Sequence, residues 1–284
     1  MRWLKSAADV VSLDEITRSG DALKRHQVAI TFDDGYLNNV DTVMPIMQRL
    51  GLPMTWFVST AFVDDPARLP WWDMIDLLLE TCQAGVEFSE PEIRGSYDLA
   101  LPPHRAWVNK TLRAIIKAAP PARRDALVRE LAGQLQRYTD IPENAFARPR
   151  EVAAIDADRV ELGGHTLSHP NLAACAESDR RHELEAGKAR LEQLSGRSLN
   201  WFAYPFGGRD TFDSATAEAV NAAGFGGAVT LLPGTVTARS NLYMLPRIAV
   251  SAALSLADFK ARVAGAPLFA WAERQRARFM PAGA

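Results

Sequence analysis

Short strand-like runs alternate with helical patterns along this sequence, and that alternation constrains the fold more than any other feature. Apolar residues at helical spacing occur in 36–51 and 178–196, and a capping-box pattern, SLDE, at 12–15 predicts a short helix before them. Strand–helix alternation predicts an α/β fold with a mainly parallel sheet. The runs that predict strands are QVAITF (27–32), PMTWFVS (53–59), VELGG (160–164), NWFAY (200–204), GGAV (226–229) and YMLPRIAV (243–250).

One long stretch interrupts the alternation between the second and third predicted strands. It covers residues 61–159, far more than a single strand-to-strand crossover needs. Helical patterns occur in it near 72–83, 105–118 and 121–137, and prolines punctuate it throughout. We therefore expect one domain over residues 1–284, with a helical insertion at about 61–159.

Composition, net charge and cysteine content limit the classes of protein to which this chain can belong. The chain has 284 residues, 48% of them hydrophobic, and a net charge of −2, which fits a folded protein without a nucleic-acid surface. Its two cysteines, Cys82 and Cys175, form no disulfide framework, and neither a leader nor a membrane span is visible. We expect a cytoplasmic protein, with homo-oligomers left open. The stretch LFAWAERQRARFM (268–280) predicts a docked terminal helix or, alternatively, a peripheral membrane contact.

Unusual residues stand at the ends of four predicted strands, where parallel α/β folds place their active sites. Asp33 and Asp34 follow the first strand, and HTLSHP (165–170) follows VELGG. YPFGG (204–208) and LPRI (245–248) accompany the later strands. These four segments are therefore the candidate site.

His165 and His169 are four residues apart, a spacing that on a helical turn lets both rings reach one divalent ion. Asp34 is the candidate third ligand. Two imidazoles and one carboxylate leave coordination positions open, as in catalytic Zn²⁺, Co²⁺, Fe²⁺ or Mn²⁺ sites. Each motif alone is a weak signal, because HxxxH arises by chance and Asp-Gly is ordinary turn chemistry. Their combination favours a metal site, with zinc as the expected ion.

The segments TFDDGY, GGHTLSHPNL and FAYPFGG, in this order, resemble the polysaccharide deacetylases of carbohydrate esterase family 4, the nodulation-protein-like deacetylase domain. The resemblance runs from about residue 27 to 264, apart from the insertion. It implies a distorted (β/α) barrel, usually of seven strands, and metal-dependent removal of N-acetyl groups from amino sugars.

The resemblance also implies roles for individual residues. Asp34, His165 and His169 would bind the metal. Asp33 would be the general base that takes a proton from the attacking water. The backbone N–H of Phe206 would stabilise the oxyanion.

Two positions depart from the family pattern. Ala203 stands where the third motif often carries an Arg that holds the catalytic Asp, and LYMLPRIAV (242–250) lacks the His that often protonates the leaving amine. The general acid is therefore unassigned, with His26 and His104 as distant candidates. Arg247 is hypothesised to orient Asp33 or to hold a substrate acid, the alternative being a structural ion pair.

Several further residues are candidates for contact with substrate. Trp71 and Trp72 begin the insertion, and indole faces stack on sugars, although aromatic residues at a helix start also serve as core anchors. Asp73, beside them, is a good helix N-cap whose carboxylate a cap loop could also bring to the site. The other candidate substrate-binding residues are Tyr204, Pro205 and Leu245.

Three functions agree with these residues. The first is a metal-dependent N-deacetylase acting on an amino sugar in a polysaccharide, an oligosaccharide or a lipid-linked glycan precursor. The second is a metal-dependent hydrolase of a non-sugar amide or cyclic imide. The third is a non-catalytic carbohydrate-binding protein of the same fold, which the acid placed beside the predicted ligands disfavours.

Overall fold

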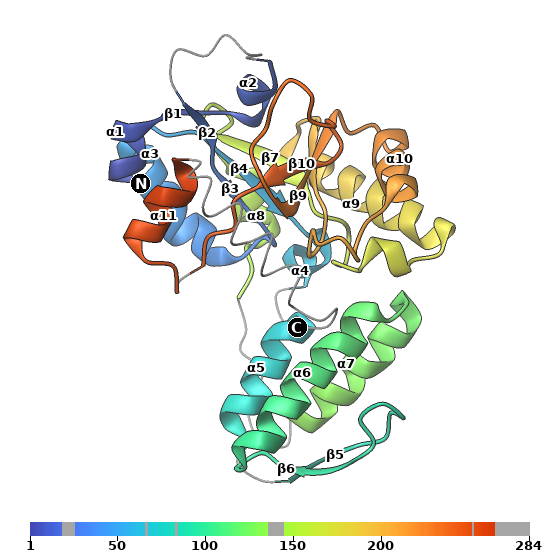
Figure 1. Cartoon of the computed structure of the whole chain (residues 1–284). Helices are drawn as coiled ribbons and strands as arrows, with labels where there is room; N and C mark the ends of the chain where they lie inside the picture. Colours follow the sequence, from blue (N-terminus) through green and yellow to red (C-terminus); the bar gives the residue numbers. More distant parts are fainter. Residues whose placement is uncertain (19–25, 66–67, 83–84, 136–144, 252, 265–284) are drawn as a thin grey trace.

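A computed structural model describes residues 1–18, 26–65, 68–82, 85–135, 145–251 and 253–264 (Figure 1). Its centre is a curled parallel sheet with the strand order β10-β9-β8-β7-β4-β3. The strands are β3 (Thr31–Phe32), β4 (Met54–Val58), β7 (Val160–Gly164), β8 (Trp201–Ala203), β9 (Gly227–Pro233) and β10 (Leu245–Arg247). A second parallel pair joins β1 (Asp9–Val11) to β2 (Gln27–Ala29). The expected α/β fold with a distorted barrel is confirmed.

The expected number of seven strands is not confirmed. The predicted strand QVAITF divides at Ile30 into β2 and β3, which pair with different neighbours, β1 and β4. The Ile30 carbonyl still accepts a hydrogen bond from the Thr55 N–H of β4, at 2.9 Å. The chain therefore passes from one partner strand to the next at this residue.

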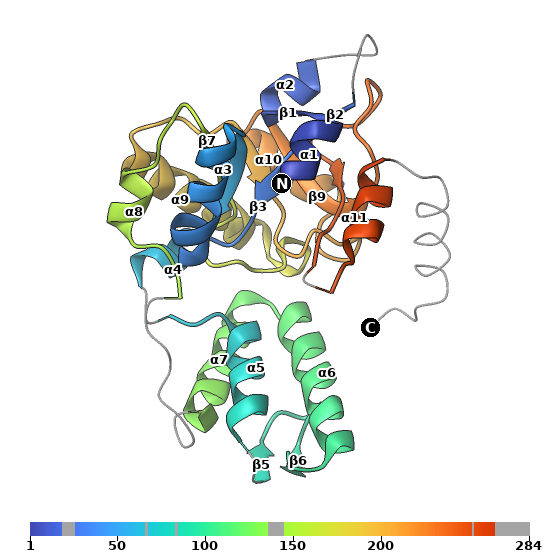
Figure 2. The same ribbon diagram turned by 90° about the vertical axis from the view of Figure 1, so that its left-hand side faces the viewer.

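Helices cover the sheet on its outer side (Figures 1 and 2). The capping box before α2 forms as predicted, because the Glu15 N–H donates to Ser12 Oγ at 3.2 Å and the Ser12 N–H donates to Glu15 Oε2 at 2.9 Å. The helices around the sheet are α1 (Arg2–Ala7), α2 (Leu13–Arg18), the π-helical turn η1 (Asn39–Val43), α3 (Met44–Leu50), α4 (Thr60–Asp64), α8 (Pro149–Ala153), the 3₁₀ turn η2 (Leu172–Ala174), α9 (Glu177–Ser195), α10 (Ser214–Ala222) and α11 (Leu256–Val263).

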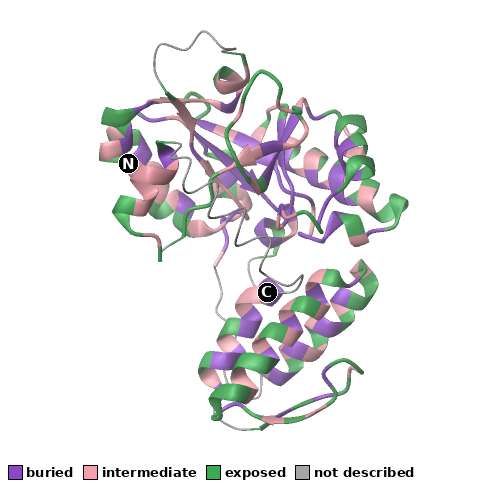
Figure 3. Ribbon diagram, in the orientation of Figure 1, coloured by how far each residue is buried: buried purple, intermediate pink, exposed green. Residues whose placement is uncertain are grey.

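The insertion has a hydrophobic core of its own, apart from that of the barrel (Figure 3). Its helices are α5 (Trp71–Thr81), α6 (Pro102–Ala118) and α7 (Pro121–Leu135), close to the three predicted helical patterns. An antiparallel hairpin of β5 (Gly85–Phe88) and β6 (Gly95–Asp98), which the helical patterns did not predict, joins α5 to α6. The ends of the stretch, α4 and α8, pack against the barrel instead, through Val63 and Val152.

Within the described residues, no helix is both long and apolar enough to cross a membrane. Cys82 and Cys175 are both buried thiols. The basic stretch predicted at 268–280 lies outside the described residues.

Glu161 lies on β7 at the end of the barrel away from the candidate site, beside a cavity of about 280 Å³. Burial raises the pKa of its carboxyl to about 7, although Thr55 Oγ1 donates a hydrogen bond to it at 3.0 Å. The folded state therefore holds this proton more tightly than the unfolded state does. The stability that Glu161 contributes is complete below about pH 4.5 and is lost as the pH rises through 7.

We predict that Glu161→Gln raises the free energy of unfolding at pH 8 by about 1–2 kcal/mol, after allowing for screening by water that reaches the side chain. The gain should disappear at pH 4, where the wild-type carboxyl is protonated in both states. Urea unfolding at the two pH values measures it, with Glu185→Gln on the exposed face of α9 as the matched control. An equal effect at both pH values would contradict the proposed cause.

Candidate metal centre

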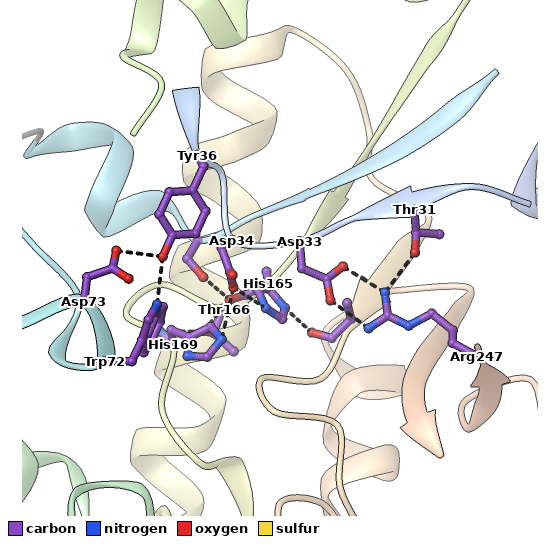
Figure 4. A network of polar contacts seen from close by, with 12 residues as sticks. Thr31, Asp33, Asp34, Tyr36, Trp72, Asp73, His165, Thr166, His169 and Arg247 are labelled. Carbon is purple, nitrogen blue, oxygen red and sulfur yellow. Dashed lines mark hydrogen bonds and ion pairs between the residues drawn. The ribbon is translucent and has the colours of Figure 1, made fainter. Parts of the chain in front are cut away.

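Asp34 lies in a turn between β3 and the helix that follows. Its backbone is left-handed, with φ of 76°, and Gly35 has φ of 101°. The Asp34 carbonyl accepts a hydrogen bond from the Ser59 N–H, just beyond β4, at 3.3 Å. A tight turn anchored to the neighbouring strand thus places the two acids at the carboxyl edge of the sheet, and Figure 4 shows their carboxylates pointing to different partners.

His165 follows β7 directly and is buried, with 2% of its surface exposed. Its Nδ1 lies 2.7 Å from the carbonyl oxygen of Ala203, which accepts a hydrogen bond when that nitrogen carries the proton. The Nε2 lone pair is then available to a metal ion. Ala203, which lacks the side chain that the family pattern led us to look for, thus contributes through its backbone.

The segment between the two histidines is not a helical turn, so the local geometry that we predicted for HxxxH is wrong. Residues 165–170, the HTLSHP loop, form a bend in which Thr166 and His169 have φ of 67° and 56°. The His169 N–H donates to Thr166 Oγ1 at 2.9 Å, which fixes this bend. The two imidazole rings nevertheless meet, with centroids 4.8 Å apart. The predicted proximity holds although the predicted local structure does not.

Helix α9 supports the loop from outside. A Cβ on Gly187 would lie 2.7 Å from the carbonyl carbon of Thr166, so any other residue there would displace the loop. Glu183, also on α9, accepts a hydrogen bond from the Ser168 N–H at 2.8 Å. Arg124 of α7 approaches from the insertion and donates to the Ser168 carbonyl and hydroxyl, at 3.3 and 3.0 Å. The sequence motifs did not indicate Gly187, Glu183 or Arg124, because these supporting residues belong to no recognisable short pattern.

Asp34, His165 and His169, which we call the triad, bring three candidate ligand atoms close together. Asp34 Oδ1 lies 3.3 Å from Nε2 of each histidine, and the three ligand atoms lie within 4.8 Å of one another. Two metal–ligand bonds of about 2.0–2.1 Å at a tetrahedral angle would separate their ligand atoms by about 3.3 Å. The two distances from Asp34 to the histidines and the donor types therefore fit a divalent ion such as zinc.

The charges in the triad agree with this fit. Burial disfavours the carboxylate of Asp34, yet hydrogen bonds to the two imidazoles hold its pKa well below the usual range. Burial also lowers the pKa of His169, which favours the neutral imidazole that binds metals. For His165, burial is outweighed by the hydrogen bond to Asp34 and the charge of Asp33, so its pKa is raised. A bound cation would counteract this increase in the pKa of His165, because the cation and the proton compete for Nε2.

Asp33 points away from the triad and is held by Arg247 of β10 (Figure 4). The two side chains form a forked pair, with Nη1 to Oδ1 at 2.8 Å and Nη2 to Oδ2 at 2.7 Å. Arg247 Nε also donates to the Thr230 carbonyl at 2.8 Å, and Nη1 donates to Thr31 Oγ1 at 3.0 Å. Burial disfavours ionised Asp33, but the guanidinium outweighs it and lowers the pKa of this carboxyl. Asp33 thus has an arginine partner on the last strand, although Ala203 stands where the family pattern often has an arginine.

We predict that Arg247→Lys lowers kcat/KM about 10- to 100-fold, because two charge-assisted hydrogen bonds to Asp33 cannot both be kept by an ammonium group. Metal content should stay at the wild-type level, since Arg247 donates its hydrogen bonds to Asp33, Thr31 and Thr230, which lie outside the triad. Steady-state kinetics with metal analysis measures both quantities, with exposed Arg239→Lys as control. Unchanged kinetics with a lower free energy of unfolding would reduce Arg247 to a structural ion pair.

The insertion reaches the triad through the first turn of α5. The Trp72 ring lies 4.5 Å from that of His169, and its Nε1 donates to the Tyr36 hydroxyl at 2.8 Å. The Tyr36 hydroxyl donates in turn to Asp73 Oδ2 at 2.8 Å. Phe206, with φ of 62°, sets its ring edge-on to His169 at 4.7 Å. Trp72 of the insertion and Phe206 of the third motif therefore both pack against His169 of the triad.

The other predicted substrate-binding residues are buried. Trp71 is 7% exposed and packs in the core of the insertion, which favours the anchoring role over stacking on a sugar. Tyr204, Pro205 and Leu245 also lie in the interior, and the Tyr204 hydroxyl donates to the Tyr243 carbonyl at 2.9 Å. Of the candidates, Trp72 alone is a partly exposed side chain at the triad.

The remaining histidines lie away from the triad. His26 precedes β2, at the amino end of the sheet, and is exposed. His104 lies on α6, where its Nδ1 accepts a hydrogen bond from the Asp98 N–H at 3.2 Å. Neither stands where it would supply a proton to a substrate at the triad.

Comparison with known proteins places this geometry in a family. Solved structures of similar fold include a deacetylase from Streptococcus pyogenes in complex with acetate, with 15% identity, a TM-score of 0.53, and coverage of 92% of this chain and 83% of that chain. A deacetylase domain from Bordetella bronchiseptica has 15% identity, a TM-score of 0.55 and coverage of 87% and 81%. A de-N-acetylase from Aggregatibacter actinomycetemcomitans has 13% identity, a TM-score of 0.57 and coverage of 92% and 86%. At such identities the likeness shows the fold alone.

No curated protein sequence matches the chain. The sequence profile of the polysaccharide deacetylases, in contrast, matches residues 20–90 and 128–228, more than half of the chain. The two matched segments contain Asp33, Asp34, both histidines of the triad and the YPFGG segment. The chain therefore belongs to the polysaccharide deacetylase family.

Proposed function

We propose that this protein removes N-acetyl groups from an amino sugar in a polysaccharide, an oligosaccharide or a lipid-linked glycan precursor, with a divalent metal held by the triad. The observation that carries the proposal is one carboxylate oxygen 3.3 Å from two imidazole nitrogens, beside a second carboxylate held by Arg247. Zinc is the expected ion, and Co²⁺, Fe²⁺ and Mn²⁺ suit the same donors.

Each group of the chain at the triad has a separate role in the proposed reaction. When bound, a divalent ion would lower the pKa of a water molecule and polarise the acetyl carbonyl. Asp33 accepts a proton from the attacking water, and the Arg247 fork fixes the direction of its lone pairs. The Phe206 N–H donates a hydrogen bond to the oxygen on which negative charge develops. Ala203 fixes the ring orientation of His165 through its carbonyl.

Acetate release by protein stripped with a chelator and reloaded with Zn²⁺, Co²⁺ or Mn²⁺ tests the proposal. The substrates are a panel of N-acetylated oligosaccharides, a few non-sugar acetamides, and cyclic imides, whose hydrolysis is followed as ring opening because they release no acetate. Acetate released from a sugar only after reloading is the expected result. Hydrolysis of the non-sugar compounds alone would show that the substrate is not an amino sugar. Sugar binding without acetate release would indicate a binding protein.

A further inference from the structure

Hydrolysis of an amide needs a proton for the leaving nitrogen, and the last strand carries no histidine to provide it. An amine leaves poorly as an anion, so a general acid must lie close to the scissile bond. Asp33 is on the side where water is deprotonated and is engaged by Arg247 through both oxygens. The donor must therefore come from elsewhere around the triad.

Asp73 lies on the other side of the triad from Asp33 (Figure 4). It belongs to the first turn of α5 and accepts the Tyr36 hydroxyl at 2.8 Å. Tyr36 in turn accepts the Trp72 indole N–H, at 2.8 Å, and the Trp72 ring packs on His169 with centroids 4.5 Å apart. This chain of contacts connects the carboxyl of the insertion to the edge of the triad. The hydrogen bond from Tyr36, which is itself held by Trp72, fixes the position of the Asp73 carboxyl.

The surroundings of Asp73 stabilise the protonated form of its carboxyl. It is half-buried, and burial raises its pKa, with further increases from the charges of Asp76 and Asp34. The Tyr36 hydrogen bond and the charge of Arg113 act in the opposite direction but do not outweigh burial. Arg113 is itself paired with Asp76. A carboxyl in such surroundings suits a general acid.

We propose that Asp73 is the general acid, the group that protonates the leaving nitrogen; the assignment rests on the proposed deacetylase function. The water oxygen bonds to the acetyl carbon while Asp33 takes one water proton. As the carbon–nitrogen bond breaks, its electron pair returns to nitrogen, which receives the Asp73 proton. Acetic acid and a free amine leave, and exchange with solvent returns a proton to Asp73 and removes one from Asp33. The insertion is thus a part of the active site.

Asp73→Asn tests the assignment, because Asn keeps the acceptor for Tyr36 but has no acidic proton. The variant and wild type are compared on an N-acetylated oligosaccharide and on 4-nitrophenyl acetate, whose leaving group needs no proton. We expect kcat on the sugar to fall about 10²- to 10³-fold, and the ester rate and metal content to stay within about twofold. Wild-type kcat on the sugar should fall as the pH rises through the pKa of Asp73, and this alkaline fall should be absent in the variant.

Two further variants sharpen the comparison. Glu80→Gln removes an exposed carboxylate from the last turn of the same helix, away from Asp73, and should leave both rates unchanged. Asp73→Glu restores an acid and should recover part of the sugar activity.

The assignment is overturned if Asp73→Asn retains the sugar activity, or if it loses the sugar and ester activities equally, which indicates a structural role. A wild-type protein that binds metal but releases acetate from neither substrate contradicts the proposed function itself, and the acid assignment is lost with it.

Discussion

Asp33→Asn is expected to lower kcat by about 10³- to 10⁴-fold while the protein keeps its full complement of metal. Asn has nearly the same shape as Asp but cannot accept a proton, and general-base catalysis contributes an effect of about 10²–10⁴-fold. The variant also loses the charge that pairs with Arg247, which adds to the loss. Arg247 keeps its bonds to Thr31 and Thr230, so the site should remain assembled.

The measurement is single-turnover acetate release together with metal analysis of the same sample. Asp41→Asn, on the exposed face of η1, is the matched control and should be indistinguishable from wild type. Wild-type turnover in Asp33→Asn would show that another group deprotonates the water. Loss of metal together with turnover would make Asp33 a ligand rather than a base.

His169→Ala and His165→Ala are expected to weaken metal binding by more than about 100-fold each, because even changes in groups that only support a ligand cost about 10–100-fold. Each variant removes one of the two nitrogens that lie 3.3 Å from Asp34 Oδ1. Activity should fall in parallel and should recover only partly at high metal concentration. Competition with a chromophoric chelator measures the affinity directly.

The control for this pair is His182→Ala, which removes an exposed histidine on α9 and should leave the affinity unchanged. Circular dichroism establishes that the variants are folded, since both triad histidines are buried. Wild-type metal affinity in either variant would remove that histidine from the triad.

The sequence predicted those features that depend on neighbouring residues. The capping box at Ser12 and Glu15 forms as predicted, because its two hydrogen bonds join residues only three apart in the chain. The positions of the acids and histidines at strand ends followed from the alternation of strands and helices, because parallel strands bring their carboxyl ends together.

Features that depend on contacts between distant segments were not predictable in detail. The HTLSHP loop bends rather than coils because Thr166 and α9 fix it, and the HxxxH spacing alone does not contain this information. Trp71 and Trp72 are equivalent in sequence, yet the packing of α5 buries one and turns the other toward His169. The hydrogen bond from Tyr36 to Asp73 likewise joins residues 37 apart in the chain, so it could not be predicted without the position of the insertion.

Metal-dependent deacetylation at the triad is tested most directly by a titration of metal-free protein with Zn²⁺, in which bound metal and acetate release from an N-acetylated oligosaccharide are measured on each sample. We expect activity to rise in proportion to bound metal and to reach its maximum at one ion per chain, and we expect Asp34→Ala to show neither tight binding nor activity. Full acetate release by the metal-free protein, or activity that does not follow metal bound at the triad, would contradict this expectation.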